Sequence, residues 1–381
     1  MAKLGELGKI ITGNTPKTSD AQNYESNDIC FVKPSDFTDN EITEIHQSEF
    51  YISAYAKDKA RVLPTDSILV TCIGTIGKVA INKVPCAFNQ QINAIVPEKK
   101  VCNPRYIAYA IQNLQPKMQS TANAAVVPIL NKTQFSNLEV PLLPVGEQKQ
   151  IACNLNKIDK LISLRKQQLA KLDELVKARF VEMFGDPSNN PMGWKKQNFE
   201  DIALLITDGE HMTPQRTNKG IYLLSARNIL NHTIQLDDVD YIDEEEYGRI
   251  ARRIVPQQGD VLVSCSGSIG RCCVVPSELK FQMVRSVALI RFNNTINPIF
   301  AEWLIATDEL QKQIYTSATQ SSQANLFQGK IRKLCGYVPP LSLQNQFAAF
   351  VERVDKQKQT VQQSLEKLEL MKKVLMQEYF G

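Results

Sequence analysis

Several features that would assign this 381-residue sequence to a common class of protein are absent from it. No apolar run approaches the length of about 18 residues that a membrane-spanning helix needs. The first residues, Met-Ala-Lys-Leu-Gly-Glu, lack the apolar core of a signal peptide. The composition therefore predicts a cytoplasmic protein without a membrane partner.

Cysteine and histidine are too few and too scattered to predict a metal site. The nine cysteines are an odd number without a Cys-x-x-Cys pair, and histidine occurs only at His46, His211 and His232. A disulfide framework and a zinc site are therefore not expected, and free thiols in a reducing compartment fit best. None of the three histidines has a nucleophile at a known motif spacing, so we expect no metal, cofactor or catalytic residue.

A strong excess of charge of one sign is also missing. The net charge is +4, and residues 1–143 carry 14 basic and 13 acidic side chains, whereas residues 186–340 carry 16 and 17. If the protein binds DNA, the binding face must arise from local arrangement and not from bulk charge. Seven acidic side chains in the ten residues 237–246 predict a solvated face away from such a surface.

Two stretches of the chain carry a heptad pattern, and they are copies of each other at an offset of 196 residues. Apolar positions alternate in steps of four and three, which is typical of a long helix packed on another helix. Both copies end in Phe-Gly. The first copy reads Ile151, Leu155, Ile158, Ile162, Arg165, Leu169, Leu172, Val176, Arg179 and Met183, and the second reads Phe347, Val351, Val354, Lys358, Val361, Leu365, Leu368, Lys372, Leu375 and Tyr379.

Basic residues interrupt each apolar seam at different places, so neither helix would pair well with itself. We therefore predict that the two helices pack on each other, antiparallel, with the long basic side chains reaching solvent. Two unrelated amphipathic helices, each on its own domain, remain the alternative.

The helices belong to a larger duplication. Ile68-Leu-Val-Thr-Cys-Ile-Gly-Thr-Ile-Gly-Lys78 matches Val261-Leu-Val-Ser-Cys-Ser-Gly-Ser-Ile-Gly-Arg271, and Val140-Pro-Leu-Leu matches Val338-Pro-Pro-Leu. The sequence therefore predicts globular domains at 1–143 and 186–340, followed by long helices at 144–185 and 341–381. Short β-rich runs predict small mixed sheets, and Asn-Pro pairs predict helices from Pro104 to about Leu114 and from Pro298 to about Tyr315. The predicted class is α+β with a pseudo-two-fold axis.

Two motifs are typical of enzymes but incomplete. Gly74-Thr-Ile-Gly-Lys78 has the wrong glycine spacing for a phosphate-binding loop, and a tight strand–turn–strand is the simpler interpretation, with a DNA phosphate contact as the alternative. Asn103-Pro-Arg-Tyr106 departs from the adenine methyltransferase motif, and no glycine-rich cofactor loop accompanies it. Helix capping explains that motif better.

Polar residues in the non-repeated loops fit base recognition better than catalysis, because Arg, Gln and Asn can bond base edges bidentately. An ordinary surface role remains open for each of them. The candidate DNA-binding residues are Asn14, Thr15, Lys17, Lys33, Ser35, Lys78, Asn89, Gln90, Gln91, Thr213, Gln215, Arg216, Arg227, Asn228, Arg271, Gln282, Arg285 and Ser286.

Two divergent globular domains, each followed by a copy of one long helix, resemble the DNA specificity subunit of type I restriction-modification systems. The resemblance covers the whole chain and rests on the glycine-containing repeat, on residues 140–151 with their variant at 338–347, and on the Phe-Gly helix ends. It implies a target recognition domain for each half of a bipartite, asymmetric DNA site. It also implies helices that act as spacer and dock for two methyltransferase subunits, with restriction subunits joining through the complex, and no catalytic residue in this chain. A coiled-coil adaptor without a DNA role and a stand-alone DNA methyltransferase are the alternatives.

Overall fold

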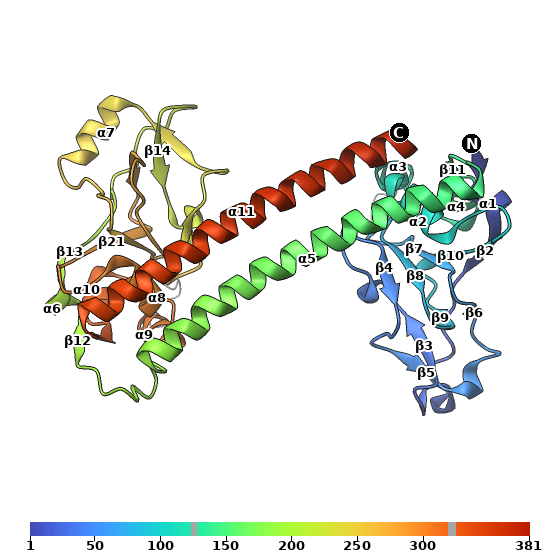
Figure 1. The fold of residues 1–381 in the computed structure, drawn as a ribbon, viewed down its shortest axis with the longest axis horizontal. Helices are drawn as coiled ribbons and strands as arrows, with labels where there is room; N and C mark the ends of the chain where they lie inside the picture. The colour runs from blue at the N-terminus through green and yellow to red at the C-terminus, as the bar shows by residue number, and fades with distance from the viewer. Residues whose placement is uncertain (123–127, 319–324) are drawn as a thin grey trace. The chain divides into compact units, whose positions relative to one another are not determined.

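The computed structural model describes residues 1–122, 128–318 and 325–381. The chain forms two compact units (Figure 1). Unit 1 comprises Met1–Gln167 with Gln362–Gly381, and unit 2 comprises Gln168–Val361. Each unit therefore contains one globular part and a segment of both long helices. Within the described ranges, no helix combines the length and the apolar character that crossing a membrane requires.

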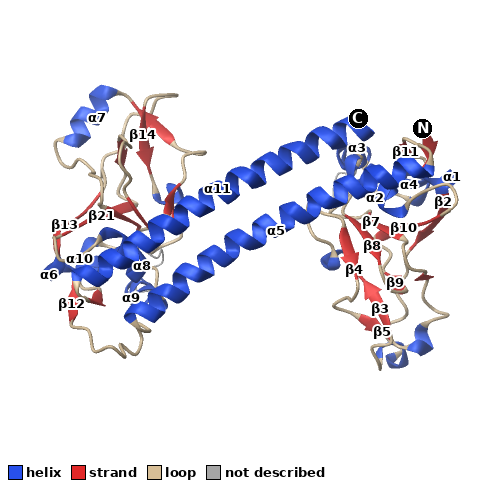
Figure 2. Ribbon diagram, in the orientation of Figure 1, coloured by secondary structure: helices blue, strands red, loops and turns tan. Residues whose placement is uncertain are grey.

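Unit 1 is built on two small sheets (Figure 2). The larger has the strand order β2-β10-β7-β8-β4, antiparallel except for the parallel pair β4–β8, and the smaller has the order β5-β3-β9-β6. The strands are β2 (Gly8–Thr12), β10 (Ile92–Pro97), β7 (Ile68–Thr71), β8 (Val79–Asn82), β4 (Thr43–Ile45), β5 (Tyr51–Ile52), β3 (Ile29–Val32), β9 (Cys86–Phe88) and β6 (Val62–Leu63). A short pair, β1 (Ala2–Lys3) with β11 (Glu139–Val140), closes the domain where the long helix begins.

Unit 2 repeats this plan with one strand fewer in each sheet. Its sheets have the orders β13-β21-β18-β19 and β17-β14-β20, with the pair β12–β22 in the place of β1–β11. The strands are β13 (Ala203–Asp208), β21 (Val287–Phe292), β18 (Val261–Ser264), β19 (Cys272–Val274), β17 (Asp240–Ile242), β14 (Ile221–Leu224), β20 (Phe281–Met283), β12 (Lys196–Asn198) and β22 (Cys335–Tyr337). A hairpin of β15 (Ile229–Leu230) and β16 (Thr233–Ile234) is added.

The repeated glycine motif forms a strand–turn–strand in both units. β7 pairs antiparallel with β8, and β18 with β19, so every residue of β7, β8 and β18 is buried in a sheet core. Gly77 and Gly270 have φ values of 90° and 83°, which side chains disfavour. The structural interpretation of this motif is confirmed.

Shorter helices cover the larger sheet of each unit, except α7 (Glu244–Ala251), which packs on the smaller sheet of unit 2. They are α1 (Leu4–Leu7), α2 (Pro104–Asn113), α3 (Gln115–Thr121) and α4 (Lys132–Ser136) in unit 1, and α6 (Phe199–Ile202), α7 (Glu244–Ala251), α8 (Pro298–Ile305), α9 (Asp308–Ala318) and α10 (Gln328–Arg332) in unit 2. The predicted caps are confirmed: the Asn103 side chain accepts a hydrogen bond from the Tyr106 amide, and that of Asn297 from the amides of Ile299 and Phe300.

The predicted single helix from Pro298 to about Tyr315 is wrong, because the chain breaks between α8 and α9. The Gln311 side chain donates to the Ile305 carbonyl at 2.8 Å, and the Thr307 hydroxyl donates to the Leu304 carbonyl at 2.6 Å. These side chains satisfy carbonyl groups at the end of α8 that a continuing helix would otherwise bond.

The two long helices are α5 (Val145–Phe184) and α11 (Leu341–Phe380), each 40 residues long. Within unit 1 the start of α5 packs with the end of α11, since Ile151 and Leu155 share a core with Met376 and Phe380. Within unit 2 the end of α5 packs with the start of α11, where the Phe184 and Phe347 rings lie 5.5 Å apart. The predicted antiparallel pairing is therefore confirmed in each unit.

The buried stripe differs from the predicted heptad at the C-terminal end of each helix. The core there contains Phe180 and Phe184 of α5 and Phe380 of α11, where the pattern places Arg179, Met183 and Tyr379. A straight helix drifts by about 20° per heptad from a strict 3.5-residue repeat. The drift brings the phenylalanine rings onto the globular parts, with Phe180 stacked on Phe300 of α8 at 5.8 Å.

The lysines that interrupt the seam of α11 bind aspartates of α5. Lys372 lies 2.7 Å from Asp159, with the two side chains 17% and 15% exposed, and Lys358 lies 2.6 Å from Asp173. Asp159 also accepts a hydrogen bond from the Tyr109 hydroxyl of α2 at 2.6 Å. The lysines thus form ion pairs across the helix pair, and with side chains 17% and 22% exposed they do not reach into solvent as predicted.

A fully buried glutamine fixes the start of each long helix to its globular part. Gln148 Oε1 accepts a hydrogen bond from the Asn103 amide at 2.8 Å, and its Nε2 donates to the Leu143 and Val101 carbonyls at 2.7 and 3.1 Å. Gln344, 196 residues later, bonds the Asn297 amide and the Pro339 and Thr295 carbonyls at 2.8, 2.8 and 3.1 Å. The same clamp therefore occurs in both units.

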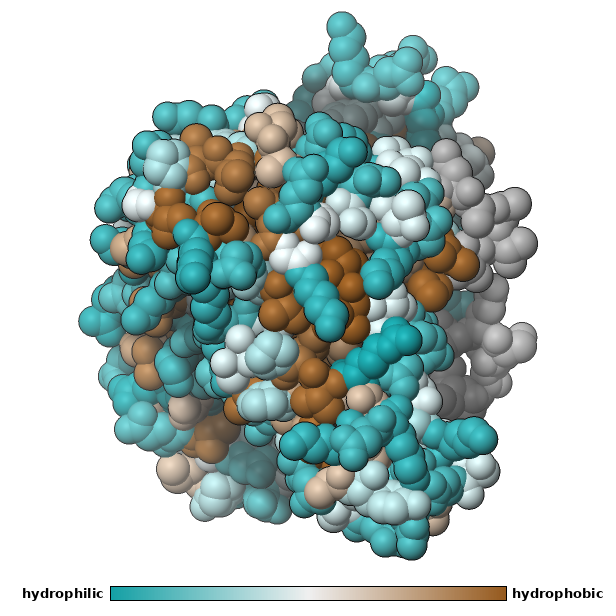
Figure 3. Space-filling view, turned by 90° about the vertical axis from the view of Figure 1, so that its right-hand side faces the viewer, coloured by the Kyte–Doolittle hydropathy of each residue, from teal (hydrophilic) through white to brown (hydrophobic). Residues whose placement is uncertain are grey.

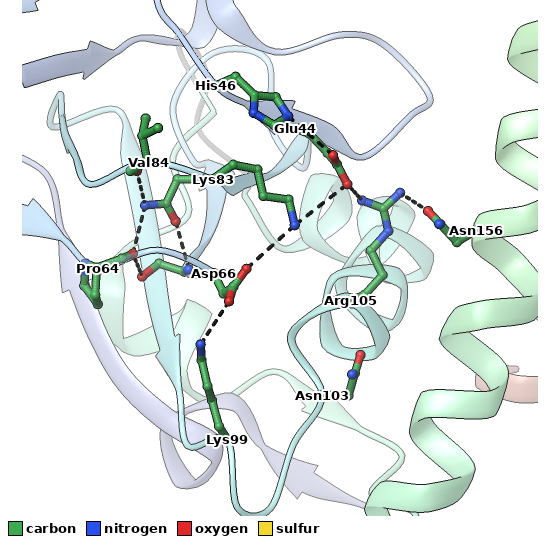
Figure 4. Close-up of polar contacts among 12 residues, drawn as sticks. Glu44, His46, Pro64, Asp66, Lys83, Val84, Lys99, Asn103, Arg105 and Asn156 are labelled. Atoms are coloured by element: carbon green, nitrogen blue, oxygen red, sulfur yellow. Dashed lines mark hydrogen bonds and ion pairs between the residues drawn. The ribbon is translucent and has the colours of Figure 1, made fainter.

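In unit 1 a polar network adds a second attachment (Figure 4). Arg105 of α2 points between β4 and α5, where it bonds Glu44 at 2.9 Å and Asn156 at 2.7 Å. Lys83 lies 3.9 Å from Glu44 and 3.7 Å from Asp66, which extends the network to the turn before β7. These contacts join the sheet, α2 and α5 into one body within the unit.

Candidate nucleic-acid interface

In unit 1, four loops converge at one edge of the larger sheet. We call residues 13–17, 72–74, 88–91 and 128–131 the edge loops of unit 1. Backbone hydrogen bonds join them: the amide of Asn14 donates to Phe88, that of Cys72 to Gln91, and that of Leu130 to Cys72. Strands β2, β7 and β10 begin or end here, so their loops must lie together.

The corresponding loops of unit 2 have the same backbone bonds. The edge loops of unit 2 are residues 209–213, 265–267, 283–286 and 325–328, and the amide of Cys265 donates to Ser286 while that of Leu326 donates to Cys265. Gly13 and Gly209 occupy equivalent places, and a Cβ on either would collide with the carbonyl oxygens of the neighbouring loop. The two units therefore present one backbone arrangement with different side chains.

The edge loops of unit 2 surround a hollow of about 480 Å³. Its lining residues are Asp208, His211, Cys265, Ser266, Arg285, Ser286, Ala288, Asn325, Leu326, Phe327 and Gln328. The floor is apolar, since Cys265, Ala288 and Leu326 are buried, and the Phe327 ring is 64% exposed. A hollow with polar side chains at its rim and an exposed aromatic ring can bind the flat, polar edge of a ligand.

Asp208 is held by three donors at the edge of this hollow. His211 Nε2 lies 2.9 Å from its carboxylate, Arg253 donates at 2.7 Å and Gln328 at 2.5 Å. Burial raises the pKa of Asp208, but these hydrogen bonds outweigh it and hold the pKa below its usual range. The carboxylate therefore stays ionised with its acceptor positions already used.

Among the predicted residues of unit 1, six lie in the edge loops. The Thr15 hydroxyl donates to Gln90 Oε1 at 2.6 Å, and both residues are exposed. The Asn14 side chain instead binds the backbone of Lys59 and Arg61 at 2.8 and 2.9 Å, and Asn89 bonds Gln91 at 2.9 Å. Thr15 and Gln90 are thus an exposed, hydrogen-bonded pair within this group.

Lys17 and the predicted residues of unit 1 outside the edge loops have varied surroundings. Lys17 is exposed on the same loop as Thr15, and Ser35 is exposed in the turn after β3. The Lys33 ammonium lies over the Phe50 ring at 3.1 Å from its centroid. Lys78 is 17% exposed and pairs with Asp39 at 2.7 Å, so a phosphate would have to compete with that carboxylate.

In unit 2, Arg285 and Ser286 lie at the hollow, whereas Thr213 and Gln215 are exposed on the loop after β13. Arg271 is half-buried after the glycine turn. Asn228 and Gln282 lie in the interior, 2% and 0% exposed, like Asn89 of unit 1 at 7%. Their amides bond backbone carbonyls or neighbouring side chains, so the structure assigns these three positions to the protein interior.

Arg216 and Arg227 share one carboxylate of the acidic stretch 237–246. Arg216 lies 2.9 Å from Asp240, and Arg227 lies 3.0 Å from it. In the same stretch Asp243 caps α7, and Glu246 bonds Arg249 at 2.8 Å. These acids therefore pair with nearby basic side chains instead of forming the purely solvated face that was predicted, and their separation from a DNA surface stays a prediction.

Of the residues that line the hollow, the sequence interpretation named only Arg285 and Ser286 as candidates. His211 was expected to have no catalytic or metal-binding role, and Asn325, Phe327 and Gln328 were not considered. The signal was present in the repeat: Leu326 follows Leu130 by 196 residues, which aligns the fourth edge loop of the two units. Without the fold, that single match has no evident meaning.

The surface of unit 1 is mixed in character. Figure 3 shows a face that is hydrophilic over most of its area, with apolar groups exposed between the polar ones. Over residues 1–122, 128–318 and 325–381, no three His, Cys, Asp or Glu side chains gather as metal ligands. A ligand would therefore be recognised by individual polar side chains of the edge loops.

Comparison with known proteins decides the family. The description "Type I restriction modification DNA specificity domain" matches residues 1–174 and again 191–370. The chain belongs to this family. The two matches follow the duplication seen in the sequence, and they confirm the resemblance drawn from it.

Family members with curated descriptions align over most of the chain. It is 24% identical to the type I restriction enzyme MjaIX specificity subunit of Methanocaldococcus jannaschii over 310 residues, 76% of this chain and 71% of that subunit. It is 20% identical to the EcoKI specificity subunit of Escherichia coli K12 over 379 residues, 93% of this chain and 81% of that subunit.

Solved structures share the fold. The S subunit of a type I restriction-modification system from M. genitalium superposes with a TM-score of 0.64 at 13% identity, covering 100% of this chain and 95% of that one. A chain from a study of type I R-M system assembly gives 0.58 at 15% identity, covering 99% and 96%. The predicted α+β class of this family, with repeated domains and long helices, is confirmed.

Proposed function

We propose that this chain is the DNA-binding specificity subunit of a type I restriction-modification complex, and that it is not itself a catalyst. It reads an asymmetric bipartite site in double-stranded DNA, with one unit for each half-site. The observation that supports this function is the repeated backbone of the edge loops, which carries amides and hydroxyls in unit 1 and charged groups in unit 2. The same backbone with two different sets of side chains can recognise two different base sequences.

The partners proposed for this subunit are two methyltransferase subunits, with restriction subunits joining through the complex in the cytoplasm. The near-neutral charge of both globular parts supports a role for these partners in binding the DNA backbone. Residues 1–143 carry 14 basic and 13 acidic side chains, a net charge of +1, and residues 186–340 carry 16 basic and 17 acidic side chains, a net charge of −1. Phosphate contacts dominate the affinity of most DNA-binding proteins, so the partners would supply much of that contact.

The long helices are proposed to set the distance between the half-sites. A straight helix of 40 residues is about 60 Å long at 1.5 Å per residue. Inserting seven residues into each helix would lengthen it by about 10 Å, close to three base pairs of B-DNA. The gap between methylated half-sites should therefore widen, and an unchanged gap would refute this role.

A domain exchange tests the function itself. Residues 1–143 are replaced by the first recognition domain of another family member, and methylated adenines are mapped genome-wide in cells that also express the methyltransferase subunit. We expect one half of the methylated site to change and the other to remain. The reciprocal exchange of 186–340 is the matched control and should alter the other half. A change in both halves after either exchange, or no sequence preference in the unaltered complex, would refute the proposal.

A further inference from the structure

Gln90 and Arg285 occupy the same position in the two sets of edge loops. The next residue in each unit, Gln91 or Ser286, accepts a backbone hydrogen bond from the first cysteine after β7 or β18. Both side chains are exposed. In each unit the two residues just before them in the chain lie against the equivalent glycine, Gly13 or Gly209. A difference in base preference between the units should therefore appear first at these two side chains.

Gln90 presents an oriented amide. The Thr15 hydroxyl donates to its Oε1 at 2.6 Å, which limits rotation of the side chain and leaves both Nε2 hydrogens directed elsewhere. The carbonyl oxygen has a second lone pair. One acceptor beside one donor in a plane matches N6 and N7 of adenine in the major groove.

Arg285 presents donors only. It lies at the rim of the hollow, and among the described residues no acceptor or carboxylate binds its guanidinium. The nearby carboxylate of Asp208 is occupied by His211, Arg253 and Gln328, so it does not draw Arg285 away. Two parallel N–H donors match O6 and N7 of guanine.

The Arg285 loop has a fixed backbone. The amide of Arg285 donates to the Glu210 carbonyl at 2.9 Å, and the Ser286 hydroxyl accepts a hydrogen bond from the Ala226 amide at 3.1 Å. These bonds order both sides of the residue, so a long side chain can bind a base with a smaller loss of entropy.

We propose that Arg285 contacts a guanine in the half-site read by unit 2, and that Gln90 contacts an adenine in the half-site read by unit 1. This inference rests on the proposed function, since it assigns individual bases within half-sites that the function requires.

The test uses the full chain in complex with its methyltransferase subunit, and adenine methylation is mapped over a genome. For Arg285→Ala we expect relaxed selection at one base pair, which is G·C in the wild-type site, by roughly 5- to 150-fold. For Gln90→Arg we expect one A·T base pair of the other half-site to change toward G·C. Arg252→Ala is the matched control, because Arg252 is exposed at the end of α7 in the same unit.

Modified DNA provides a second measurement that does not depend on a variant folding. Duplexes containing 7-deazaguanine at the assigned position keep their base pairing but lose the N7 acceptor. The wild-type complex should bind such duplexes more weakly, whereas Arg285→Ala should bind modified and unmodified duplexes equally. Co-purification with the methyltransferase subunit verifies that each variant is assembled.

The outcomes separate this inference from the function on which it rests. Bipartite methylation with unchanged base preference in Arg285→Ala and Gln90→Arg would overturn the base assignments and leave the function standing. A wild-type complex that methylates without any sequence preference would overturn both. Loss of selectivity at several base pairs at once would also overturn the assignments, because it would indicate a general structural effect.

Discussion

The buried glutamine at the start of each long helix offers the sharpest test of how the helices are attached. Gln148→Leu keeps the approximate volume of the side chain but removes three hydrogen bonds, to Asn103, Leu143 and Val101. Each buried polar group left without a partner costs about 1–3 kcal/mol. The carbonyl of Val101 can regain water because that residue is 44% exposed, so we expect a net loss of about 2–4 kcal/mol.

The repeat and the two tryptophans make this prediction measurable unit by unit. Trp194 and Trp303 are the only tryptophans of the sequence, and both belong to unit 2. Their fluorescence therefore reports on unit 2, whereas far-ultraviolet circular dichroism reports on the whole chain. In urea, Gln344→Leu should lower the midpoint of the fluorescence transition, by about 1 M if the slope is about 2–3 kcal/mol per M. Gln148→Leu should shift mainly the dichroism transition.

A matched control is available on the same helix. Gln150 is exposed and makes one side-chain hydrogen bond, to Asn154 at 3.1 Å. Gln150→Leu should therefore change the free energy of unfolding by less than about 0.5 kcal/mol. If Gln148→Leu proved no more destabilising than Gln150→Leu, the clamp would not hold the helix and the reasoning would fail.

Three further predictions concern the helix pair and the hollow. Lys372→Met should destabilise the protein by about 3 kcal/mol, because it leaves the mostly buried Asp159 without its ion-pair partner. Lys358→Met should cost less than about 1 kcal/mol, because its partner Asp173 is 59% exposed. Thermal unfolding of the two variants measures the difference. The pKa of Asp208 lies below its usual range, so its ionised form stabilises the fold above about pH 4, and that stability is lost as the pH falls through the folded pKa. Asp208→Asn should therefore lower the Tm at pH 7, and its difference in Tm from wild type should shrink on acidification. Leu365→Asp places a charge at a buried seam position and should abolish co-purification with the methyltransferase subunit, with normal co-purification refuting the role of the helices as a dock.

The regular parts of the fold could be predicted because their signals are local. Periodic apolar residues predicted both long helices, and the Asn-Pro pairs predicted the caps of α2 and α8. The repeated glycine motif predicted a tight turn. Each of these depends on residues within one or two turns of helix or within one hairpin, where spacing alone determines which side chains meet.

The exposure and partners of loop residues were decided by the tertiary structure. Asn89, Asn228 and Gln282 have the side chains of DNA-contacting residues, yet they lie in the interior, where the fold supplies their hydrogen-bond partners. Likewise Arg216 and Arg227, which lie outside the strands, meet at Asp240 of β17. Residue type indicates what a side chain can bond, but not which backbone will approach it.

The sequence by itself determined the duplication and predicted the helix pairing and the family of this protein, because repetition and heptad spacing can be read without coordinates. Only the tertiary structure decided which loops converge. Loops far apart in the chain meet because antiparallel strands return their ends to one edge of a sheet. That convergence brought His211 and Asn325 to the same hollow as Arg285, and it placed Gln90 at the equivalent position of the other unit.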